Sequence, residues 1–582
     1  MHSRVCFFNS PLFFYQCFRL CVHSRMYVRG MPNDFNNWNM SLWNWTVMEG
    51  YFRKMENYDE GLWPEPPFWS NFSAPTTTCN ETTTTTGSKS RLPSWRGTTG
   101  PIATMPAGPA VDAVAPLFVQ SCRNSGIPVA YRGFNQPNTT DRMGAGYFEF
   151  NILNGVRNSV AEAILGGMNP HGSTIPTNLD IQLGATVRRV LFGKKTQNGT
   201  LPATGVEVAA SVEGGSPQLY MLDAQRSAHS EVVLAAGAVL TPQILWNSDI
   251  GANGTVADLP GVGKEIIDQP AYPMVFELLP SVAEQAPSLY TMSMAMESYF
   301  ISVDELNILQ NKRRQTLWNA TISGTNTTQA IQNSSSITAQ KLNQTLARMW
   351  MEAPGLGTMG TSGFSAGAFL RSPYATTKAE ADLQLTVFPR VTEPHVLREE
   401  INKQPNLAKY ESAFDGAMLV KVSLLEPEAR FRVYPAASSS STDGQFHIPS
   451  IGLAPNATRY LTPLDVKRLA WGVEKVRSIF ASRPLSQNTG AEILPGTGVT
   501  GSALHQHIHK NHIRNSNWVG TCRMGPAGND GVVVDEQVRV HGVDKLRIVD
   551  ASIFPATPNG NPHSSVVAVA SRAADLIWNG RS

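Results

Sequence analysis

Charged residues are scarce in this sequence. Asp, Glu, Lys and Arg make up 16% of its 582 residues, and the formal net charge is only +2. Average globular chains contain roughly a quarter of charged residues. A protein that binds nucleic acid usually concentrates a basic excess on one face, and the composition shows no such excess. We therefore expect no nucleic-acid partner.

Long apolar runs and cysteines are scarce as well. No stretch of about 18 apolar residues occurs, so the sequence predicts no membrane span. Six cysteines in a chain of this length do not make a disulfide framework, although Cys79 and Cys122 could pair. The length suits a protein with more than one domain.

The amino terminus lacks a glycine-rich turn. No G-x-G-x-x-G motif occurs near it, and residues 1–21 show neither a strand pattern nor a clear signal-peptide cleavage site. Such glycines let the backbone approach a nucleotide's pyrophosphate closely. This part of the chain therefore does not read as a complete nucleotide-binding unit.

Asn-x-Ser/Thr sequons, in contrast, are abundant. Their number is roughly twice what chance would give in a chain this rich in Asn, Ser and Thr, which favours a secreted glycoprotein. They begin at Asn39, Asn44, Asn71, Asn80, Asn138, Asn198, Asn253, Asn319, Asn326, Asn333, Asn343 and Asn456.

The carboxyl-terminal stretch 515–582 has the clearest pattern. Residues 546–549 are mostly apolar and end at Asp550, as in a buried parallel strand with function at its carboxyl end. A turn rich in Pro, Asn and Gly follows, and apolar residues then recur at helical spacing over 564–578. We expect Asn561 to cap this helix and Pro562 to be its first residue. The start of a helix suits an anion or an electron-rich ring.

Three sequences in this stretch, NWVGTCRMG, VHGVDKLRIVDASIFP and NGNPHSS, resemble the carboxyl end of the glucose–methanol–choline (GMC) family of flavin oxidoreductases. Residues 230–251 resemble the family's second signature, and residues 22–39 resemble the second half of its first. The resemblance implies an α/β fold (α+β overall) with an FAD-binding Rossmann-like domain that is incomplete at its amino end. It also implies a substrate domain with a mostly antiparallel sheet covered by helices.

The resemblance divides the chain into four parts. Residues 1–21 are unmatched, and residues 22–270 correspond to the FAD-binding domain without its first βαβ unit. Residues 271–510 correspond to the substrate-binding domain, and residues 511–582 to the part that carries the catalytic motifs. Because the match begins inside a signature, we expect the gene upstream of Met1 to encode the missing strand, glycine-rich turn and helix.

The resemblance also implies FAD as the cofactor. Small residues between Ala235 and Leu240 would let the backbone approach it, and we expect Thr241 to cap a helix that begins at Pro242. Val187 matches a residue whose backbone meets the adenine in relatives, although a plain core valine is the alternative. The residues implied in cofactor binding are His23, Val187, Gly237, Ala238, Asp550, Ala551, Asn561 and Pro562.

In the family, a base removes the proton of a hydroxyl group while hydride passes from carbon to flavin N5. The resemblance places the base at Asn517 and its hydrogen-bonding partner at Asn561. An amide can hydrogen-bond an alcohol but cannot take its proton at pH 7, and loss of a general base costs ~10²–10⁴-fold in rate. The implied substrate is a small alcohol or sugar, and the implied electron acceptor is oxygen or a quinone.

Several alternatives stay open at this point. His512 or His563 could replace the missing base, or each could be a local polar group. His505, His507 and His509 would share one face of a strand, but no carboxylate or thiol completes a metal site, and we expect none. A structural thiol is the favoured reading of Cys522. Besides oxidation, the fold could serve a hydroxynitrile-lyase-like reaction, and the chain could be a flavin-free pseudoenzyme or a truncated gene product.

Overall fold

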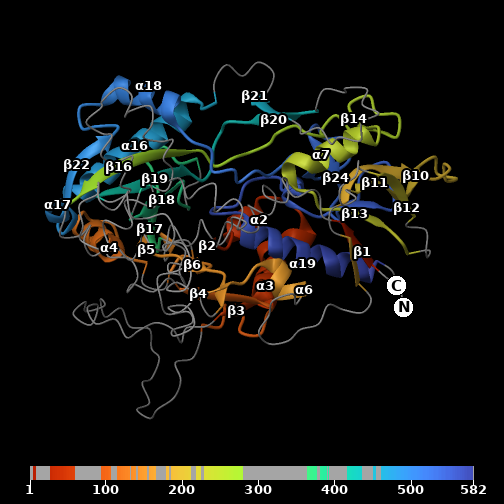
Figure 1. Ribbon diagram of the computed structural model, residues 1–582, viewed down its shortest axis with the longest axis horizontal. Coiled ribbons are helices and arrows are strands. Elements are labelled where there is room, and N and C mark those ends of the chain that lie inside the picture. The colour runs from red at the N-terminus through yellow and green to blue at the C-terminus, as the bar shows by residue number, and fades with distance from the viewer. Residues whose placement is uncertain are drawn as a thin grey trace, which may run out of the picture.

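The computed structural model describes residues 4–7, 26–58, 93–279, 364–391, 416–435, 450–453 and 460–580, with short gaps inside some of these ranges. Figure 1 shows two halves that lie side by side. One half is a broad sheet with α4, α16 and α18, and the other contains α7 and the strands around it. Among the described residues, no helix combines the length and apolar character that a membrane crossing requires.

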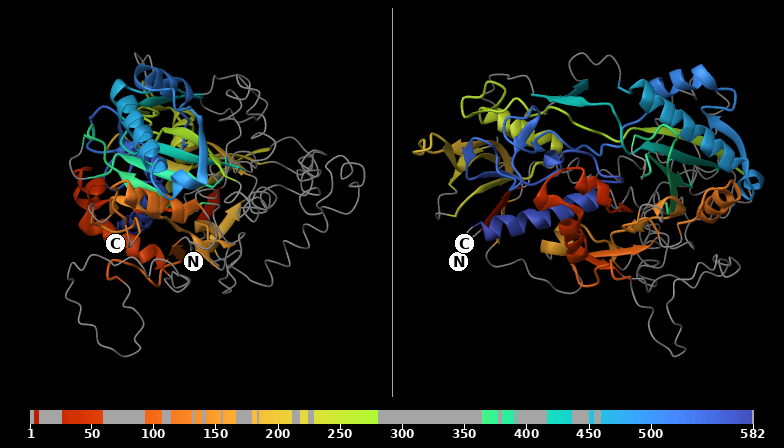
Figure 2. Two further views of the ribbon diagram at one scale, coloured as in Figure 1. Left: turned by 90° about the vertical axis from the view of Figure 1, so that its left-hand side faces the viewer. Right: turned by 180° about the vertical axis from the view of Figure 1, so that it is seen from behind.

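The larger sheet has six strands, and every neighbouring pair is antiparallel. Helices α4 (Val114–Asn124), α16 (Pro463–Phe480) and α18 (Gly501–Asn511) pack against it. The rear view in Figure 2 shows α16 lying across the strands. In spatial order the strands are β22 (Thr489–Leu494), β16 (Ala271–Leu278), β19 (Ala417–Leu424), β18 (Leu383–Phe388), β17 (Ala366–Leu370) and β5 (Gly144–Tyr147).

The two faces of this sheet differ in character because side chains alternate along a strand. Leu383, Leu385 and Val387 of β18 share a buried apolar core with α16, as do the even-numbered residues 418–424 of β19. The residues between them face the other way. These are Gln384, Thr386 and Phe388 on β18, and Leu419, Lys421 and Ser423 on β19.

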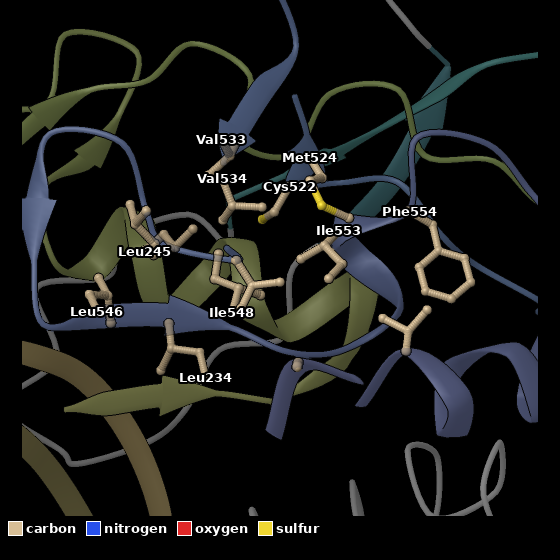
Figure 3. Packing of buried hydrophobic residues seen from close by; sticks show 14 of the residues in the cluster. Leu234, Leu245, Cys522, Met524, Val533, Val534, Leu546, Ile548, Ile553 and Phe554 are labelled. Atoms are coloured by element: carbon tan, nitrogen blue, oxygen red, sulfur yellow. The ribbon is translucent and has the colours of Figure 1, made fainter. Parts of the chain in front are cut away.

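The second half contains a parallel pair, β13 (Val232–Leu234) with β26 (Leu546–Ile548). Helix α7 (Gly237–Asn247) follows β13, and the short helix η6 (Ala551–Ile553) follows β26. Figure 3 shows Leu234, Leu245 and Ile548 among the side chains that meet in one apolar core. A separate antiparallel sheet packs into the same core and consists of β10 (Ala185–Phe192), β11 (Leu201–Ala210) and β12 (Gln218–Asp223), with β25 (Val543–Asp544) beside β11.

Helix α19 (His563–Asn579) packs along α3 (Trp45–Met55). A small sheet next to them has the order β2 (Met26–Tyr27), β6 (Glu149–Phe150), β4 (Ile102–Pro106) and β3 (Glu56–Tyr58). The remaining described elements are β1 (Arg4–Phe7), α2 (Pro32–Asn36), η1 (Ser41–Trp43), β7 (Ile152–Leu153), β8 (Val156–Arg157), α6 (Val160–Leu165), β9 (Leu179–Gln182), β14 (Ile250–Gly251), β15 (Ala257–Asp258), β20 (Phe431–Tyr434), β21 (Ser450–Leu453), α17 (Leu485–Asn488), β23 (Arg523–Met524) and β24 (Val532–Val534).

Two expectations about the chain's organisation need correction. Residues 1–21 were expected to show no strand, yet β1 pairs in parallel with β9. Such pairing depends on a partner far away in sequence and leaves little local signal. In addition, α4 and β5 lie inside the range 22–270 that we assigned to the FAD-binding part. However, β5 is a strand of the six-stranded sheet, and α4 packs against that sheet.

The starts of two helices also differ from expectation. Helix α7 begins at Gly237, so Pro242 lies inside it. Proline has no N–H for the carbonyl four residues earlier, that of Ala238, and the Thr521 hydroxyl donates to this carbonyl instead, at 2.6 Å. The Thr241 hydroxyl does not cap the helix but donates to Asp550.

Helix α19 begins at His563, with Pro562 at the capping position and no side-chain cap. The Asn561 side chain instead accepts a hydrogen bond from Gln384. The stretch that holds His505, His507 and His509 is helix α18, not a strand, so alternate spacing does not put these rings on one face.

The two faces of β18 allow a matched test of the fold. Leu385→Ala should lower the free energy of unfolding by ~2–5 kcal/mol, because it leaves a cavity in the core under α16. Thr386→Ala, one residue along on the other face, should cost about 1 kcal/mol or less, since it removes a single hydroxyl contact with Gln384. Urea unfolding measures both. Equal losses would contradict the assignment of faces.

Candidate active site

A cavity of about 160 Å³ lies against the polar face of the six-stranded sheet. Among the described residues that line it, Lys421 is the only charged one, and none is a histidine or a carboxylate. The lining consists of Met26, Gln269, Phe364, Gln384, Thr386, Phe388, Lys421, Ser423, Leu425, Asn515, Asn517 and Asn561.

Hydrogen bonds fix the orientation of Gln269. Its Nε2 donates to the carbonyl oxygens of Pro558 and Gly560, both at 3.0 Å. Carbonyl oxygens only accept, so Oε1 of Gln269 must lie on the opposite side, where Nδ2 of Asn517 donates to it at 2.9 Å. The orientation of Asn517 follows, and its Oδ1 is left as an acceptor for a group in the cavity.

Asp268 holds the backbone behind these two amides. One of its oxygens accepts the N–H groups of Gln269, at 2.8 Å, and of Asn517, at 2.9 Å. Burial raises the pKa of the Asp268 carboxyl, and the N–H donors oppose that rise. Asp268 is not among the residues that line the cavity, so its place in the structure is that of a support.

Asn561 reaches the same cavity from the turn before α19. Nε2 of Gln384 donates to Oδ1 of Asn561 at 3.4 Å, which leaves Nδ2 of Asn561 as a donor. Asn517 and Asn561 therefore line one cavity, as we expected, and they offer complementary groups. A bound hydroxyl can donate to Asn517 and accept from Asn561, while their catalytic roles stay a prediction.

The two histidines considered as replacement bases do not line this cavity. His512 follows α18, and its Nδ1 lies 3.0 Å from the carbonyl oxygen of His509. His563 is the first residue of α19, and burial together with the charge of Arg157 lowers the pKa of its ring to about 4. Neither imidazole is placed to take a proton from a group held by Asn517.

The residues expected to bind the cofactor fall into two groups. Oδ2 of Asp550 accepts from the N–H of Gly237, at 2.9 Å, and from the Thr241 hydroxyl, at 2.6 Å. The carbonyl of Ala551 accepts from the N–H of Gly520 at 3.1 Å. The two Asp550 bonds tie the start of α7, with Gly237 and Ala238, to the turn after β26, with Asp550 and Ala551.

The other residues expected to bind the cofactor come from different parts of the chain. Val187 is a buried residue of β10, which packs against α7. Pro562 and Asn561 precede α19, and His23 lies outside the described residues. Cys522 is fully buried in the apolar core, and burial raises the pKa of its thiol, which suits the structural role that we expected.

The turn before α19 also has polar atoms suited to a bound group. Thr557 Oγ1, Asn559 Oδ1 and Ser565 Oγ are buried and have no hydrogen-bond partner within the described part of the chain. Unpaired buried polar atoms are costly, so they are expected to meet a ligand or water. Together with the uncapped start of the 17-residue helix α19, they fit an electron-rich cofactor such as a flavin.

A parallel strand pair with a helix start over its carboxyl end lies beside an amide-lined cavity on an antiparallel sheet, an arrangement that suits the binding of a cofactor next to a small polar substrate. Residues 21–271 match the amino-terminal family model described as GMC oxidoreductase, and residues 442–570 match the carboxyl-terminal one. The chain belongs to the GMC oxidoreductase family, whose members are FAD-dependent oxidoreductases that act on alcohols.

Individual relatives are distant. The chain is similar to the oxygen-dependent choline dehydrogenase of Staphylococcus xylosus, with 26% identity over 96% of this chain and 79% of that protein. It is also similar to the chloroplastic fatty acid photodecarboxylase of Chlamydomonas reinhardtii, with 24% identity over 95% of this chain and 76% of that protein. The crystal structure of pyridoxine 4-oxidase from Mesorbium loti shares the fold, with a TM-score of 0.63, 19% identity, and coverage of 96% of this chain and 83% of that one.

The Asp34 carboxyl supports the turn that carries Asn561, and Glu380 is a charged neighbour of Asp34. Oδ2 of Asp34 accepts the N–H of Asn559 at 2.8 Å, and Arg142 donates to the Asn559 carbonyl. Burial and the neighbouring Glu380 raise the pKa of Asp34 to about 8. Burial, together with Glu426, raises the pKa of Glu380 to about 7. The pair therefore holds a proton at neutral pH that the unfolded chain releases.

The raised pKa of Asp34 makes stability depend on pH. Between about pH 4 and pH 8 the folded protein binds more protons here than the unfolded chain does, so its stability falls as the pH rises. Asp34→Asn keeps an acceptor oxygen but does not titrate. The loss in midpoint temperature from pH 5 to pH 8 should therefore be smaller in Asp34→Asn than in wild type.

Asp575→Asn is the matched control. The pKa of Asp575 is lowered through Lys54 and Tyr51 despite some opposing desolvation, so this carboxyl is ionised throughout the window. Its replacement should leave the pH 5 to pH 8 difference unchanged. An unaltered difference in Asp34→Asn would show that Asp34 does not hold the proton.

Proposed function

We propose that this chain oxidises the hydroxyl group of a small alcohol or sugar with FAD as cofactor and passes the electrons to oxygen or a quinone. The observation that carries the proposal is the amide pair in one cavity. Oδ1 of Asn517 accepts a hydrogen bond from the substrate hydroxyl, and Nδ2 of Asn561 donates to the same oxygen. Bound FAD supplies the acceptor for the hydride that leaves the carbinol carbon.

Asp550 and the start of α19 support the cofactor's place in this proposal. Asp550 orders the turn at Ala551 and the first residues of α7, where small side chains leave the backbone accessible. The unpaired oxygen atoms of Thr557, Asn559 and Ser565 lie on the turn and helix that follow. These are the residues that would hold the flavin.

The amide pair cannot supply a general base. Oxidation of an alcohol releases the hydroxyl proton, and no described residue in the lining can take it at neutral pH. In this proposal the proton leaves to water, since no described lining residue takes it, while Asn517 and Asn561 hold the oxygen in place. We infer a slow enzyme for simple alcohols, because they ionise only far above neutral pH.

Asn517→His tests this account directly. A histidine here would donate one N–H to Oε1 of Gln269, which can only accept, and would present the other ring nitrogen to the cavity as a base. The rate of flavin reduction by a primary alcohol should rise by at least about tenfold, the lower part of the usual gain from a general base. It should also acquire a pH dependence near the ordinary imidazole pKa.

Asn517→Gln is the control, because it keeps the amide and should show no such gain. Rates are measured by anaerobic stopped-flow on protein that contains flavin. An unchanged rate in the histidine variant would mean that another group is the base or that alcohol oxidation is not the reaction.

The lack of a base in the described lining also favours a second candidate, a protein of this fold without catalytic flavin chemistry. The absorption spectrum of the purified chain separates the possibilities. A colourless protein supports a flavin-free pseudoenzyme. A yellow protein that alcohols bleach supports oxidation, and a yellow protein that splits a cyanohydrin without bleaching supports the lyase-like reaction.

We further propose that the protein is secreted and glycosylated. Among the described sequons, Asn39, Asn138, Asn198 and Asn253 have exposed side chains. Asn44 differs, because its Oδ1 caps α3 through Val47 and its Nδ2 donates to the Ser41 carbonyl at 3.0 Å. The amide nitrogen that would take the glycan is therefore engaged in the fold at Asn44.

Expression in a secreting eukaryotic host should give a product whose gel mobility increases after glycosidase treatment. Asn198→Gln should remove one glycan, whereas Asn44→Gln should leave the glycan mass unchanged. Mass spectrometry of the released peptides checks both variants. Unchanged mobility of the wild-type protein after glycosidase would count against secretion.

A further inference from the structure

The turn at residues 558–560 is held by two sets of contacts. One comes from the cavity lining, where Nε2 of Gln269 donates to two carbonyl oxygens of the turn. The other comes from three further segments of the chain, which bond to the backbone and side chain of Asn559. Asn561, whose side chain lines the cavity, follows the turn directly. The position of Asn561 therefore depends on contacts made outside the cavity.

Asn559, the middle residue of the turn, uses three of its four polar groups in this second set. Its N–H donates to Oδ2 of Asp34 at 2.8 Å, and its Nδ2 donates to the Ala381 carbonyl at 2.6 Å. Its carbonyl accepts from Nη2 of Arg142, whose Nη1 donates to the Arg29 carbonyl at 3.0 Å. Asn559 and Arg142 are almost fully buried, so these hydrogen bonds are shielded from water.

The turn has little room to move while these bonds are in place. Gly560 has a φ of +143°, and a Cβ atom added there would lie 2.5 Å from Cγ1 of Val28 and 2.8 Å from Nη2 of Arg142. The Arg142 guanidinium in turn lies over the Phe369 ring, 4.2 Å from its centre. Closely packed segments do not deform gradually, so the loss of a holding contact displaces such a turn as a unit.

The charges around Asp34 make its hold on the turn depend on pH. Glu380 and Arg142 act on Asp34 from the segments before β18 and β5, and Glu426 is a charged neighbour of Glu380. Burial and the Glu380 charge raise the pKa of Asp34 well above its ordinary range. A displaced turn no longer covers Asp34, which then releases its proton to water. Displacement therefore becomes easier as the pH rises toward about 8.

We propose that Asp34 is a positioning residue for the amide pair, because it holds Asn559 and thereby determines where Nδ2 of Asn561 stands in the cavity. Asp34 is not among the described residues that line the cavity. Rising pH releases the turn, so hydroxyl binding weakens toward about pH 8 although neither amide of the pair titrates. This inference rests on the proposed function for the amide pair as a hydroxyl site, but hydroxyl binding is measured without any oxidation.

The test compares phenol, which has a hydroxyl group but no carbinol hydrogen, with toluene, in which a methyl group replaces the hydroxyl. Isothermal titration calorimetry on the full chain with FAD added should show roughly tenfold tighter binding of phenol at about pH 5.5, as two neutral hydrogen bonds contribute. At about pH 8.5, where phenol is still mostly neutral, the preference should fall to about threefold or less.

Two substitutions at Asp34 separate positioning from the pH effect. Asp34→Asn keeps an acceptor oxygen for the Asn559 N–H and cannot titrate, so the phenol preference should be about tenfold at both pH values. Asp34→Leu removes the acceptor and should leave about threefold or less at both. In the Asn561→Ala background, Asp34→Leu should add no further loss. Asp575→Asn on α19 is the control and should behave like wild type.

A phenol preference in Asp34→Leu equal to that of wild type would overturn the proposal, as would the same pH dependence in Asp34→Asn and wild type. An additional loss from Asp34→Leu in the Asn561→Ala background would also contradict it, and so would a wild type that does not prefer phenol. Thermal unfolding shows which variants are folded, and the pH profile of Asp34→Asn decides alone if Asp34→Leu is not.

Anaerobic mixing with benzyl alcohol examines oxidation separately. A phenol preference that depends on Asp34, without bleaching of the flavin, keeps the positioning role and rejects the oxidation. Bleaching together with a phenol preference that Asp34→Leu does not change keeps the oxidation and rejects the positioning role.

Discussion

The hydrogen bonds of Gln269 determine the geometry of the site. One side-chain amide ties together three segments that are far apart in the sequence: its own, the turn at 558–560 and the loop at Asn517. Its loss would leave the buried Gly560 carbonyl without a donor among the described residues, at a cost of ~1–3 kcal/mol, whereas the Pro558 carbonyl keeps the N–H of Gly560. Since the carbonyls dictate which end of Gln269 faces Asn517, the amide orientation is set before any substrate binds. Such preorganised groups need no rearrangement when charge develops.

The six-stranded sheet forms a wall of the cavity into which these amides point, and the two ends of the cavity carry different side chains. Its apolar face is covered by helices, which leaves the opposite face of β18 and β19 for polar groups. Gln384 and Ser423 continue the amide network, and Lys421 adds a charge two residues further along. The amide groups of the cavity are placed to hold a hydroxyl, and the described residues that line it include no base. Binding and orientation, more than proton transfer, are what this set of side chains can contribute.

Much of the half that contains α7, β13 and β26 could be predicted from the sequence, because its strands and helices have strong local patterns. The run before Asp550 and the helical spacing after Ser564 both correspond to elements in the structure, β26 and α19. Helix starts were predicted less well. The Thr521 hydroxyl donates to the Ala238 carbonyl that Pro242 leaves without a helical N–H, and α7 continues through this proline. The Asn561 side chain faces the cavity, where it accepts from Gln384, and does not cap α19. Neither contact can be deduced from the local sequence.

The cavity wall was harder to find. Gln269 donates two hydrogen bonds to the 558–560 turn, and these depend on tertiary contacts that the local sequence does not reveal. Gln384 and Thr386 alternate with leucine and valine, and Lys421 and Ser423 do the same on β19. That alternation is a usable signal for a sheet with one polar face. The strand at 4–7 has no such pattern, because its partner at 179–182 is distant in sequence.

Gln269 acts in this site by holding the Asn517 side chain in one orientation. The most direct test is a double-mutant cycle of Gln269→Ala and Asn517→Ala, in which the rate of flavin reduction is measured for the wild type, both single variants and the double variant. Asn517→Ala should lower the rate strongly when Gln269 is present but by less than about twofold in the Gln269→Ala background, because Asn517 is then no longer oriented. Equal fold-losses in the two backgrounds would show that the residues act independently, and would contradict the account.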